Sequence, residues 1–274
     1  METFNIPRLD LLEFTQGNSE QREKFSKDIG KAFNETGFVT IANHGLSPQE
    51  IDELYKTVKA FFDLPLEVKQ KYEFPEYAGQ RGYTSPGKET AKGAKVPDLK
   101  EFWQRGQTIR DEEYSKADFP DNPKVDELPE FDVVTGEVYR KLENAGRELL
   151  KAIALYLGLD EFYFEKFVFN GNSILRAIHY FPIEKPEELA PDAVRAGAHE
   201  DINLITLLIG ASAEGFENSG VVKYGGNMFY VTNRYSVNME DLVDDLEGSM
   251  YCEVISNIYD DPEMWEEYDE KPNN

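Results

Sequence analysis

The chain has 274 residues, of which 40 % are hydrophobic and 13 % aromatic, enough to bury one large core or two small ones. Its 53 acidic side chains outnumber the 29 basic ones, and the resulting net charge of −24 disfavours nucleic acid and anionic membranes as partners. The single cysteine, Cys252, excludes an internal disulfide and a thiolate cluster, so a metal site would use histidine and carboxylate ligands.

No apolar run approaches the length of about eighteen residues that a membrane helix needs. The first residues, METFNIPRLDLLEF, also lack the basic and then apolar form of a signal peptide. The sequence therefore predicts a globular, cytoplasmic protein. Residues 240 to 270 hold 13 acids and no Lys or Arg, which predicts a surface or a loosely held tail and not part of a core.

The N-terminal part predicts a helix followed by a strand. Residues 19–36 carry apolar side chains at helical spacing, and Gly37 can end this helix in a left-handed cap; the apolar positions are Phe25, Ile29, Ala32 and Phe33. The next segment, GFVTIANHG, has β-branched residues between glycines and reads as a short strand that runs into a turn.

A second helix is predicted from its start signals. Ser47 is placed as the N-cap, Pro48 as the first helical residue, and Glu50 completes a capping box. Its expected buried stripe consists of Ile51, Leu54, Tyr55, Val58 and Phe62.

The rest of the chain divides into loops, one long helix and several strands. Residues 74–130 are rich in Gly, Pro, Asp and Lys without a sustained period, so long loops are expected there. Residues 131–157 have helical spacing and end at Gly158. Beyond this helix the period changes to two in SILRAIHYF, NLITLLIGA and GVVKYGGNMFYV. The pattern predicts an α+β protein with a mainly helical first half and a mainly β second half.

Residues 195–215, RAGAHEDINLITLLIGASAEG, place His199 and Asp201 two positions apart ahead of an apolar run. Side chains at i and i+2 of a β-strand project to the same face, so these two groups can converge on one metal ion. Iron, manganese and zinc all suit such ligands. The alternative is a surface histidine and aspartate that are neighbours by chance.

A series of motifs follows in order along residues 4 to 236. In the first half they are NIPRLDL, AFNETGFVTIANHGLSP, AFFDLPLEVKQKY, GQRGYTSPGKETAKG and VPDLKEFW. In the second half they are NSILRAIHYFPI, RAGAHEDINLITLLIGAS and VVKYGGNMFYVTN. Together they resemble the iron(II) and 2-oxoglutarate-dependent dioxygenases of the isopenicillin N synthase-like type.

This resemblance implies a double-stranded β-helix, or jelly roll, with an N-terminal helical region. It divides the chain into residues 1–120, the non-haem dioxygenase N-terminal region, and residues 121–274, the jelly-roll region. The second part is atypical after residue 216, where part of the jelly-roll strands is expected to be missing. The expected partner is a small-molecule substrate.

The same resemblance implies a site for iron(II) and for 2-oxoglutarate as co-substrate. His199 and Asp201 match the family's H-x-D metal ligands. Arg234 and Ser236 in NRYSV match its R-x-S pair, and Tyr180 in HYFP matches the tyrosine, which together anchor the distal carboxylate of the keto acid. An arginine fork suits a carboxylate. The alternatives are an exposed polar strand face for Arg234 and Ser236, and a core aromatic for Tyr180.

The remaining two histidines are expected to be structural. His44 lies in the turn NHG beside a helix start, where turn residues commonly bond to the backbone. His179 is one residue from Tyr180 and should occupy the opposite face of the strand. It is interpreted as a packed histidine and not as a ligand.

The family pattern breaks downstream of the H-x-D motif, because no histidine follows His199. The family's second histidine ligand is therefore absent, as if the hairpin that carries it had been removed. Two hypotheses follow: an oxidoreductase that oxidises a small organic substrate with O₂ and 2-oxoglutarate, or a catalytically silent relative that acts as a binding protein. A third ligand would have to come from water or from the tail, with Asp241, Cys252 and Glu253 as candidates.

Overall fold

The computed structural model describes residues 6–77, 79–90, 95–108, 120–181, 189–190, 193, 204–209, 229–232 and 251–256, the last two segments by their backbone alone. Along the chain the elements are β1 Arg8–Asp10, α1 Leu11–Thr15, α2 Ser19–Thr36, β2 Phe38–Ala42, α3 Pro48–Phe62, α4 Leu66–Lys69, η1 Gln70–Tyr72, η2 Pro75–Tyr77, β3 Gly82–Thr84, β4 Glu101–Gly106, α5 Phe131–Tyr156, α6 Glu165–Val168, β5 Ile174–His179, β6 Thr206–Ile209, β7 Phe229–Thr232 and β8 Tyr251–Ser256.

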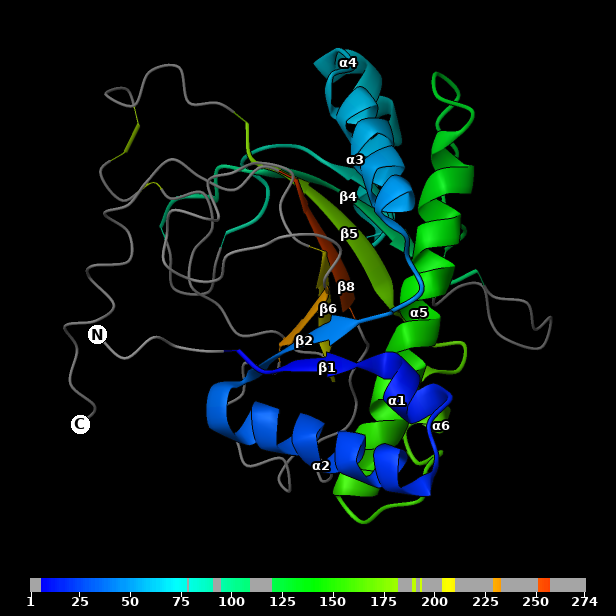
Figure 1. Ribbon diagram of the computed structural model, residues 1–274. Helices are drawn as coiled ribbons and strands as arrows, with labels where there is room; N and C mark the ends of the chain where they lie inside the picture. Colours follow the sequence, from blue (N-terminus) through cyan, green and yellow to red (C-terminus); the bar gives the residue numbers. More distant parts are fainter. Residues whose placement is uncertain are drawn as a thin grey trace.

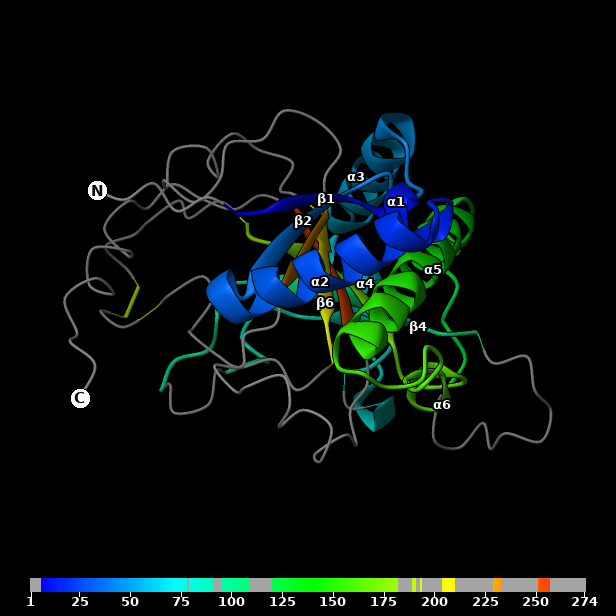
Figure 2. The same ribbon diagram turned by 60° about the horizontal axis from the view of Figure 1, so that its bottom comes forward.

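Both capped helices form as the sequence predicts. The Asn18 side chain accepts from the backbone N–H of Gln21 to open α2, and Gly37 ends this helix with a φ of 72°. In α3 the reciprocal capping box between Ser47 and Glu50 is present, with Pro48 at the first position. The long helix α5 packs against both α2 and α3 (Figures 1 and 2). None of the described helices is long and apolar enough to cross a bilayer.

The described strands form one eight-stranded sheet in the order β1-β2-β7-β6-β8-β5-β4-β3 (Figure 1). The predicted strands around residues 38–42, 174–179, 206–209 and 229–232 are confirmed. With helices α2, α3 and α5, this sheet confirms the α+β class; the described strands belong to this one sheet and do not test the complete jelly roll.

The acidic tail contributes a central strand, so the expectation of a surface or a loosely held tail over residues 240–270 is wrong for residues 251–256. Strand β8 lies between β5 and β6 and is parallel to both. The segment YCEVIS is the apolar part of an otherwise acidic stretch. The net charge of a segment of thirty residues does not indicate whether it contains a strand of six residues, because a strand needs only a short run of suitable residues.

The expectation of loops throughout residues 74–130 is also wrong, because β3 and β4 lie within this range. Every residue of β4 except Arg105 is buried, so both faces of the strand are covered. A strand buried on both sides has no alternation of apolar and polar residues, and its sequence gives no period-two signal.

An aromatic cluster fills the space between α3, α5 and the sheet. Phe61 is fully buried, and its ring lies 4.8 Å from that of Trp103 and 5.2 Å from that of Phe131. The expected stripe on α3 is confirmed for Leu54, Val58 and Phe62, whereas Ile51 and Tyr55 are half-buried and Phe61 was not among the expected residues. The two consecutive phenylalanines are both buried because Phe61 packs against Trp103 and Phe131, whereas Phe62 stacks on His179.

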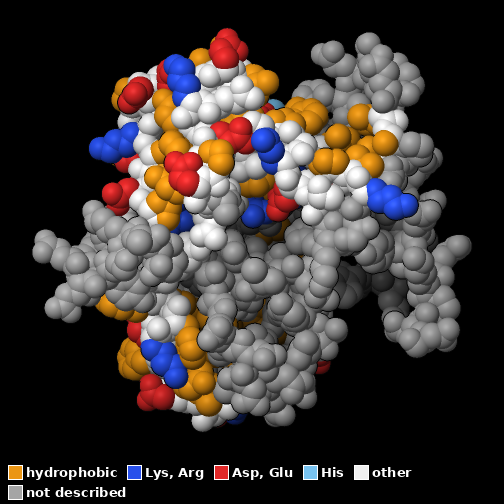
Figure 3. All heavy atoms as spheres, turned by 180° about the vertical axis from the view of Figure 1, so that it is seen from behind, with side chains coloured by type: hydrophobic (Ala, Val, Ile, Leu, Met, Phe, Trp, Pro, Cys, Tyr) orange, Lys and Arg blue, Asp and Glu red, His pale blue; other side chains and the backbone are white. Residues whose placement is uncertain are grey.

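On the face in Figure 3, described Lys and Arg side chains lie among Asp, Glu and apolar side chains. Several exposed ion pairs follow helical spacing, for example Lys31 with Glu35 at 3.7 Å and Lys59 with Asp63 at 2.5 Å. Such exposed pairs contribute about 1 kcal/mol at most, so the fold depends mainly on its buried groups.

Candidate functional site

Of the five predicted site residues, the structure describes Tyr180. His199, Asp201, Arg234 and Ser236 lie outside the described residues, so their roles stay predictions. Tyr180 directly follows β5 and is 7 % exposed. The H-x-D segment precedes β6, which starts at Thr206 and is separated from β5 in the sheet by β8 alone.

Among the described residues, no three His, Cys, Asp or Glu side chains gather closely enough to hold a metal ion. The predicted ligands offer one imidazole and one carboxylate, donors that suit iron(II). Of the tail residues considered as a third ligand, Cys252 is aligned in register with Leu175 and Leu207, and Glu253 with Arg176. Asp241 lies outside the described residues.

Residues alternate between the two faces of the paired strands β4 and β5. The helix-covered face carries Trp103 in the aromatic cluster, Leu175 and Ala177 in the main core, and His179, whose ring stacks on that of Phe62 at 5.1 Å. His179 is thus a packed histidine, as the sequence predicts.

The opposite face carries Phe102 and Arg176. The Arg176 guanidinium lies 4.8 Å from the centre of the Phe102 ring and 3.5 Å from the carboxylate of Glu89. Tyr180 follows the last residue of β5 and lies outside the main core cluster, so strand alternation predicts for it the same face as Arg176, away from the helices.

A buried carboxylate, Glu101, joins four elements on the helix-covered face. It accepts hydrogen bonds from the Lys69 ammonium at 2.7 Å and from the Tyr83 hydroxyl, and its other oxygen lies 2.8 Å from Nδ1 of His179. Lys69 also donates to the backbone oxygen of Phe62 at 3.0 Å. Glu101, Lys69 and Tyr83 are 4 %, 7 % and 1 % exposed, respectively.

The charge state of this cluster follows from its contacts. Burial tends to raise the pKa of the Glu101 carboxyl, but hydrogen bonds from His179, Lys69 and Tyr83 outweigh burial and hold that pKa below its ordinary value. Burial and the neighbouring carboxylate both raise the pKa of the Tyr83 hydroxyl. Tyr83 therefore donates as a neutral phenol to an ionised Glu101, and an ionised carboxylate 2.8 Å from Nδ1 of His179 favours the tautomer with an N–H at that nitrogen.

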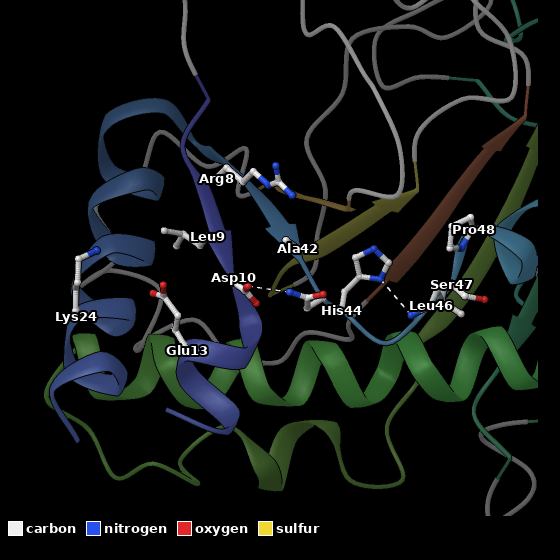
Figure 4. A pocket seen from close by; sticks show the side chains of 11 residues that line it. Arg8, Leu9, Asp10, Glu13, Lys24, Ala42, His44, Leu46, Ser47 and Pro48 are labelled. Atoms are coloured by element: carbon white, nitrogen blue, oxygen red, sulfur yellow. Dashed lines mark hydrogen bonds between the residues drawn. The ribbon is translucent and has the colours of Figure 1, made fainter. Parts of the chain in front are cut away.

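A pocket of about 710 Å³ lies elsewhere, where β1 and β2 meet the starts of α1 and α3 (Figure 4). Its wall includes Asp10, whose carboxylate accepts from the Asn43 amide at 2.8 Å, and His44, whose Nδ1 accepts from the backbone N–H of Leu46 at 3.3 Å. His44 is 3 % exposed, and its bond across the NHG turn gives it the structural role that the sequence predicts. Neither Tyr180 nor the Glu101 cluster lines this pocket.

The Glu101 cluster was not foreseen from the sequence. Lys69, Tyr83 and Glu101 lie within three of the motifs quoted above, AFFDLPLEVKQKY, GQRGYTSPGKETAKG and VPDLKEFW. The available signal was a charged residue directly beside buried aromatics, as in KEFW, because such a charge usually has a partner.

Comparison with known proteins gives the family. Residues 6–125 match the model of the non-haem dioxygenase in morphine synthesis N-terminal region. The 2-oxoglutarate-dependent dioxygenase frbA of Dothideomycetidae sp. is 32 % identical over 79 % of this chain and 68 % of its own length. The chain belongs to the 2-oxoglutarate and iron(II)-dependent dioxygenases.

Two solved structures extend the likeness to the fold. A 2OG-Fe(II) oxygenase family protein from Caulobacter crescentus is 34 % identical, with a TM-score of 0.69 over 86 % of this chain and 75 % of that one. A Neurospora crassa protein, solved in complex with alpha-KG and 5-formyluracil, is 26 % identical, with a TM-score of 0.67 over 85 % and 72 % of the two chains. Two further curated relatives are covered over only 62 % and 65 % of their length, so the chain spans about two thirds of such relatives.

Proposed function

We propose that this protein oxidises a small organic substrate with O₂ and 2-oxoglutarate at a mononuclear non-haem iron. His199 and Asp201 would hold the metal, and Arg234, Ser236 and Tyr180 would bind the distal carboxylate of the keto acid. The observation that carries the proposal is an intact H-x-D motif, directly before β6, in a chain that belongs to the dioxygenase family.

The proposed residues suit these roles by their chemistry. An iron(II) ion supplies the oxidising chemistry when it is bound. The imidazole of His199 and the carboxylate of Asp201 are donors that iron(II) accepts, and the Arg234 guanidinium offers paired N–H groups to a carboxylate. Tyr180 is buried directly after β5, and its phenol hydroxyl is a donor that a carboxylate can accept.

The first experiment is anaerobic addition of iron(II) and 2-oxoglutarate to the protein. A visible charge-transfer band is expected, since the keto acid and the metal would be bound together. His199→Ala should abolish the band, whereas Glu200→Ala, which changes the residue between the two ligands, should retain it. No band from the unmodified protein at high concentrations of both would contradict the proposed site.

The second experiment tests the anchor. Arg234→Ala should weaken 2-oxoglutarate binding about 10-fold or more, because hydrogen bonds to charged groups contribute about 1.5–3 kcal/mol. Asn233→Ala is the matched control and should bind normally. Equal affinities in the two variants would remove Arg234 from the site.

A catalytically silent relative is the second candidate, because residues 200–274 contain no histidine. This alternative expects 2-oxoglutarate binding without release of succinate when O₂ is admitted.

If a tail group completes the metal site, Glu253→Gln should weaken iron binding, with Glu247→Gln as the control. This substitution is a better test than removal of the tail, because β8 lies in the centre of the sheet.

A further inference from the structure

The last residue of β5 is fixed by a side-chain cluster, and the next residue is Tyr180. Glu101 and His179 are register partners at one end of the ladder between β4 and β5. Strand ends open more readily than strand centres, because few hydrogen bonds hold them. Here the contact between Glu101 and His179 at 2.8 Å adds a side-chain bond at that end.

Glu101 is itself held from two other elements. The Lys69 ammonium comes from α4 and the Tyr83 hydroxyl from β3, and both groups are buried with it. A carboxylate that accepts three donors has little freedom to turn. The cluster therefore joins α4, β3, β4 and β5 at one point.

A stacking contact on one face of its ring also restrains the imidazole of His179. It stacks on the Phe62 ring with an interplanar angle of 25°, and the backbone oxygen of Phe62 accepts from Lys69 at 3.0 Å. His179 is thus held by Glu101 at one nitrogen and by α3 at one face. Its rotamer and its backbone position are both determined by these contacts.

We infer that Lys69, Tyr83, Glu101 and His179 are positioning residues that set the place of Tyr180 and thereby the affinity for 2-oxoglutarate. The inference rests on the proposed function, in which Tyr180 contacts the keto acid. Strand alternation places consecutive residues on opposite faces, so the cluster would act on Tyr180 through the backbone that follows His179 and would not itself contact the ligand. Groups that orient a ligand-binding residue from behind contribute to affinity in this indirect way.

The chain offers a matched pair of variants for the test. Tyr83→Phe removes the hydroxyl that bonds to Glu101 at the Tyr180 end of β5. Tyr139→Phe removes a hydroxyl that is also buried and that donates to the backbone oxygen of Ser173 at 3.2 Å, directly before the other end of β5. Each variant loses one buried phenol hydroxyl, but only the hydroxyl of Tyr83 bonds at the end of β5 that Tyr180 follows.

The affinity for 2-oxoglutarate is measured by anaerobic titration of the charge-transfer band in excess iron(II). Tyr83→Phe should weaken binding about 10-fold, in the range found for groups that orient ligands. Tyr139→Phe should bind as the unmodified protein does. In a Tyr180→Phe background, Tyr83→Phe should have no further effect, because the residue through which it acts is already changed.

A second pair of variants tests the cluster without altering Tyr83. His179→Asn keeps an N–H donor near the place of Nδ1 and should retain affinity, whereas His179→Leu keeps the volume without the donor and should lose it. The position of Tyr180 is read independently by fluorine NMR of protein labelled with 3-fluorotyrosine. Its resonance, identified by its loss in Tyr180→Phe, should shift in Tyr83→Phe and not in Tyr139→Phe.

The outcomes separate the inference from the proposed function. Equal affinities in Tyr83→Phe and Tyr139→Phe, or additive effects of Tyr83→Phe and Tyr180→Phe, would overturn the inference and leave the proposed function intact. Absence of 2-oxoglutarate binding by the unmodified protein would overturn both. An unshifted Tyr180 resonance in Tyr83→Phe would overturn the inference whatever the binding result.

Discussion

Replacing Glu101 by glutamine should destabilise the fold strongly, because it leaves a buried ammonium without its counter-charge. The Lys69 and Glu101 side chains are 9 % and 5 % exposed, and their charged atoms lie 2.7 Å apart. Removal of one partner from such a buried pair costs about 3–5 kcal/mol. At about 2–4 °C per kcal/mol, the melting temperature should fall by roughly 6–20 °C.

The assay is urea unfolding followed by circular dichroism at neutral pH. Asp63→Asn is the control, since the Lys59 and Asp63 side chains are 71 % and 59 % exposed and such pairs contribute about 1 kcal/mol at most. Adding Lys69→Met to Glu101→Gln should recover part of the loss, because no unpaired charge then remains. If Glu101→Gln costs no more than Asp63→Asn, the buried pair does not stabilise the fold as argued.

The pH dependence of the same variant gives an independent check. The pKa of Glu101 is lowered in the folded state, so its stabilising contribution is complete above the ordinary value of 4.5 and is lost as the pH falls through the folded pKa. The stability difference between the unmodified protein and Glu101→Gln should therefore shrink in acid. A difference that grows below pH 4.5 would contradict the sign of the shift.

Three further changes test other parts of the fold. Ending the chain after Met250 removes β8 and should abolish cooperative unfolding, whereas ending it after Asn257 should retain it; light scattering and circular dichroism distinguish the two. Phe61→Ala should cost about 3–5 kcal/mol in urea unfolding, because it empties the centre of the aromatic cluster, and a cost below about 1 kcal/mol would argue against that packing. Hydrogen bonds from Lys141 and from the α3 cap lower the pKa of Glu50 to about 2, so its contribution is present above pH 4.5 and is lost as the pH falls towards 2; Glu50→Gln should flatten the acid limb of a stability titration.

Local signals in the sequence predicted the helices well. The cap at Ser47 and the left-handed glycine at Gly37 act within a few residues of the chain, so their effect can be recognised without the fold. The strands with one apolar face were found for the same reason. Strand β4 was missed because burial on both faces removes the alternation, and β8 was missed because its six residues lie within an acidic stretch.

The candidate site was predicted by its motifs and not by its geometry. His199 and Asp201 were predicted because their spacing suits one face of a strand and because they match the family's H-x-D motif, and neither argument needs a distant residue. The Glu101 cluster depends on residues 69, 83, 101 and 179, which come together only when α4, β3, β4 and β5 are assembled. No local sequence pattern predicts contacts between such distant residues. Sequence reasoning could therefore identify the residues of this cluster only as charged residues expected to be buried without a known partner.

The central place of β8 also affects the order in which the protein can fold. Ile174 of β5 and Thr206 of β6 both pair with Tyr251 of β8. Strands β5 and β6 can therefore complete their pairing only after β8, which is synthesised much later, has left the ribosome. Contacts between distant parts of a chain form slowly, since a large loop must close first. During synthesis the facing edges of β5 and β6 lack their common neighbour, and such open edges favour pairing with other chains. Yield in the cell should therefore depend on chaperones and on the rate of translation more strongly than the stability of the finished fold suggests.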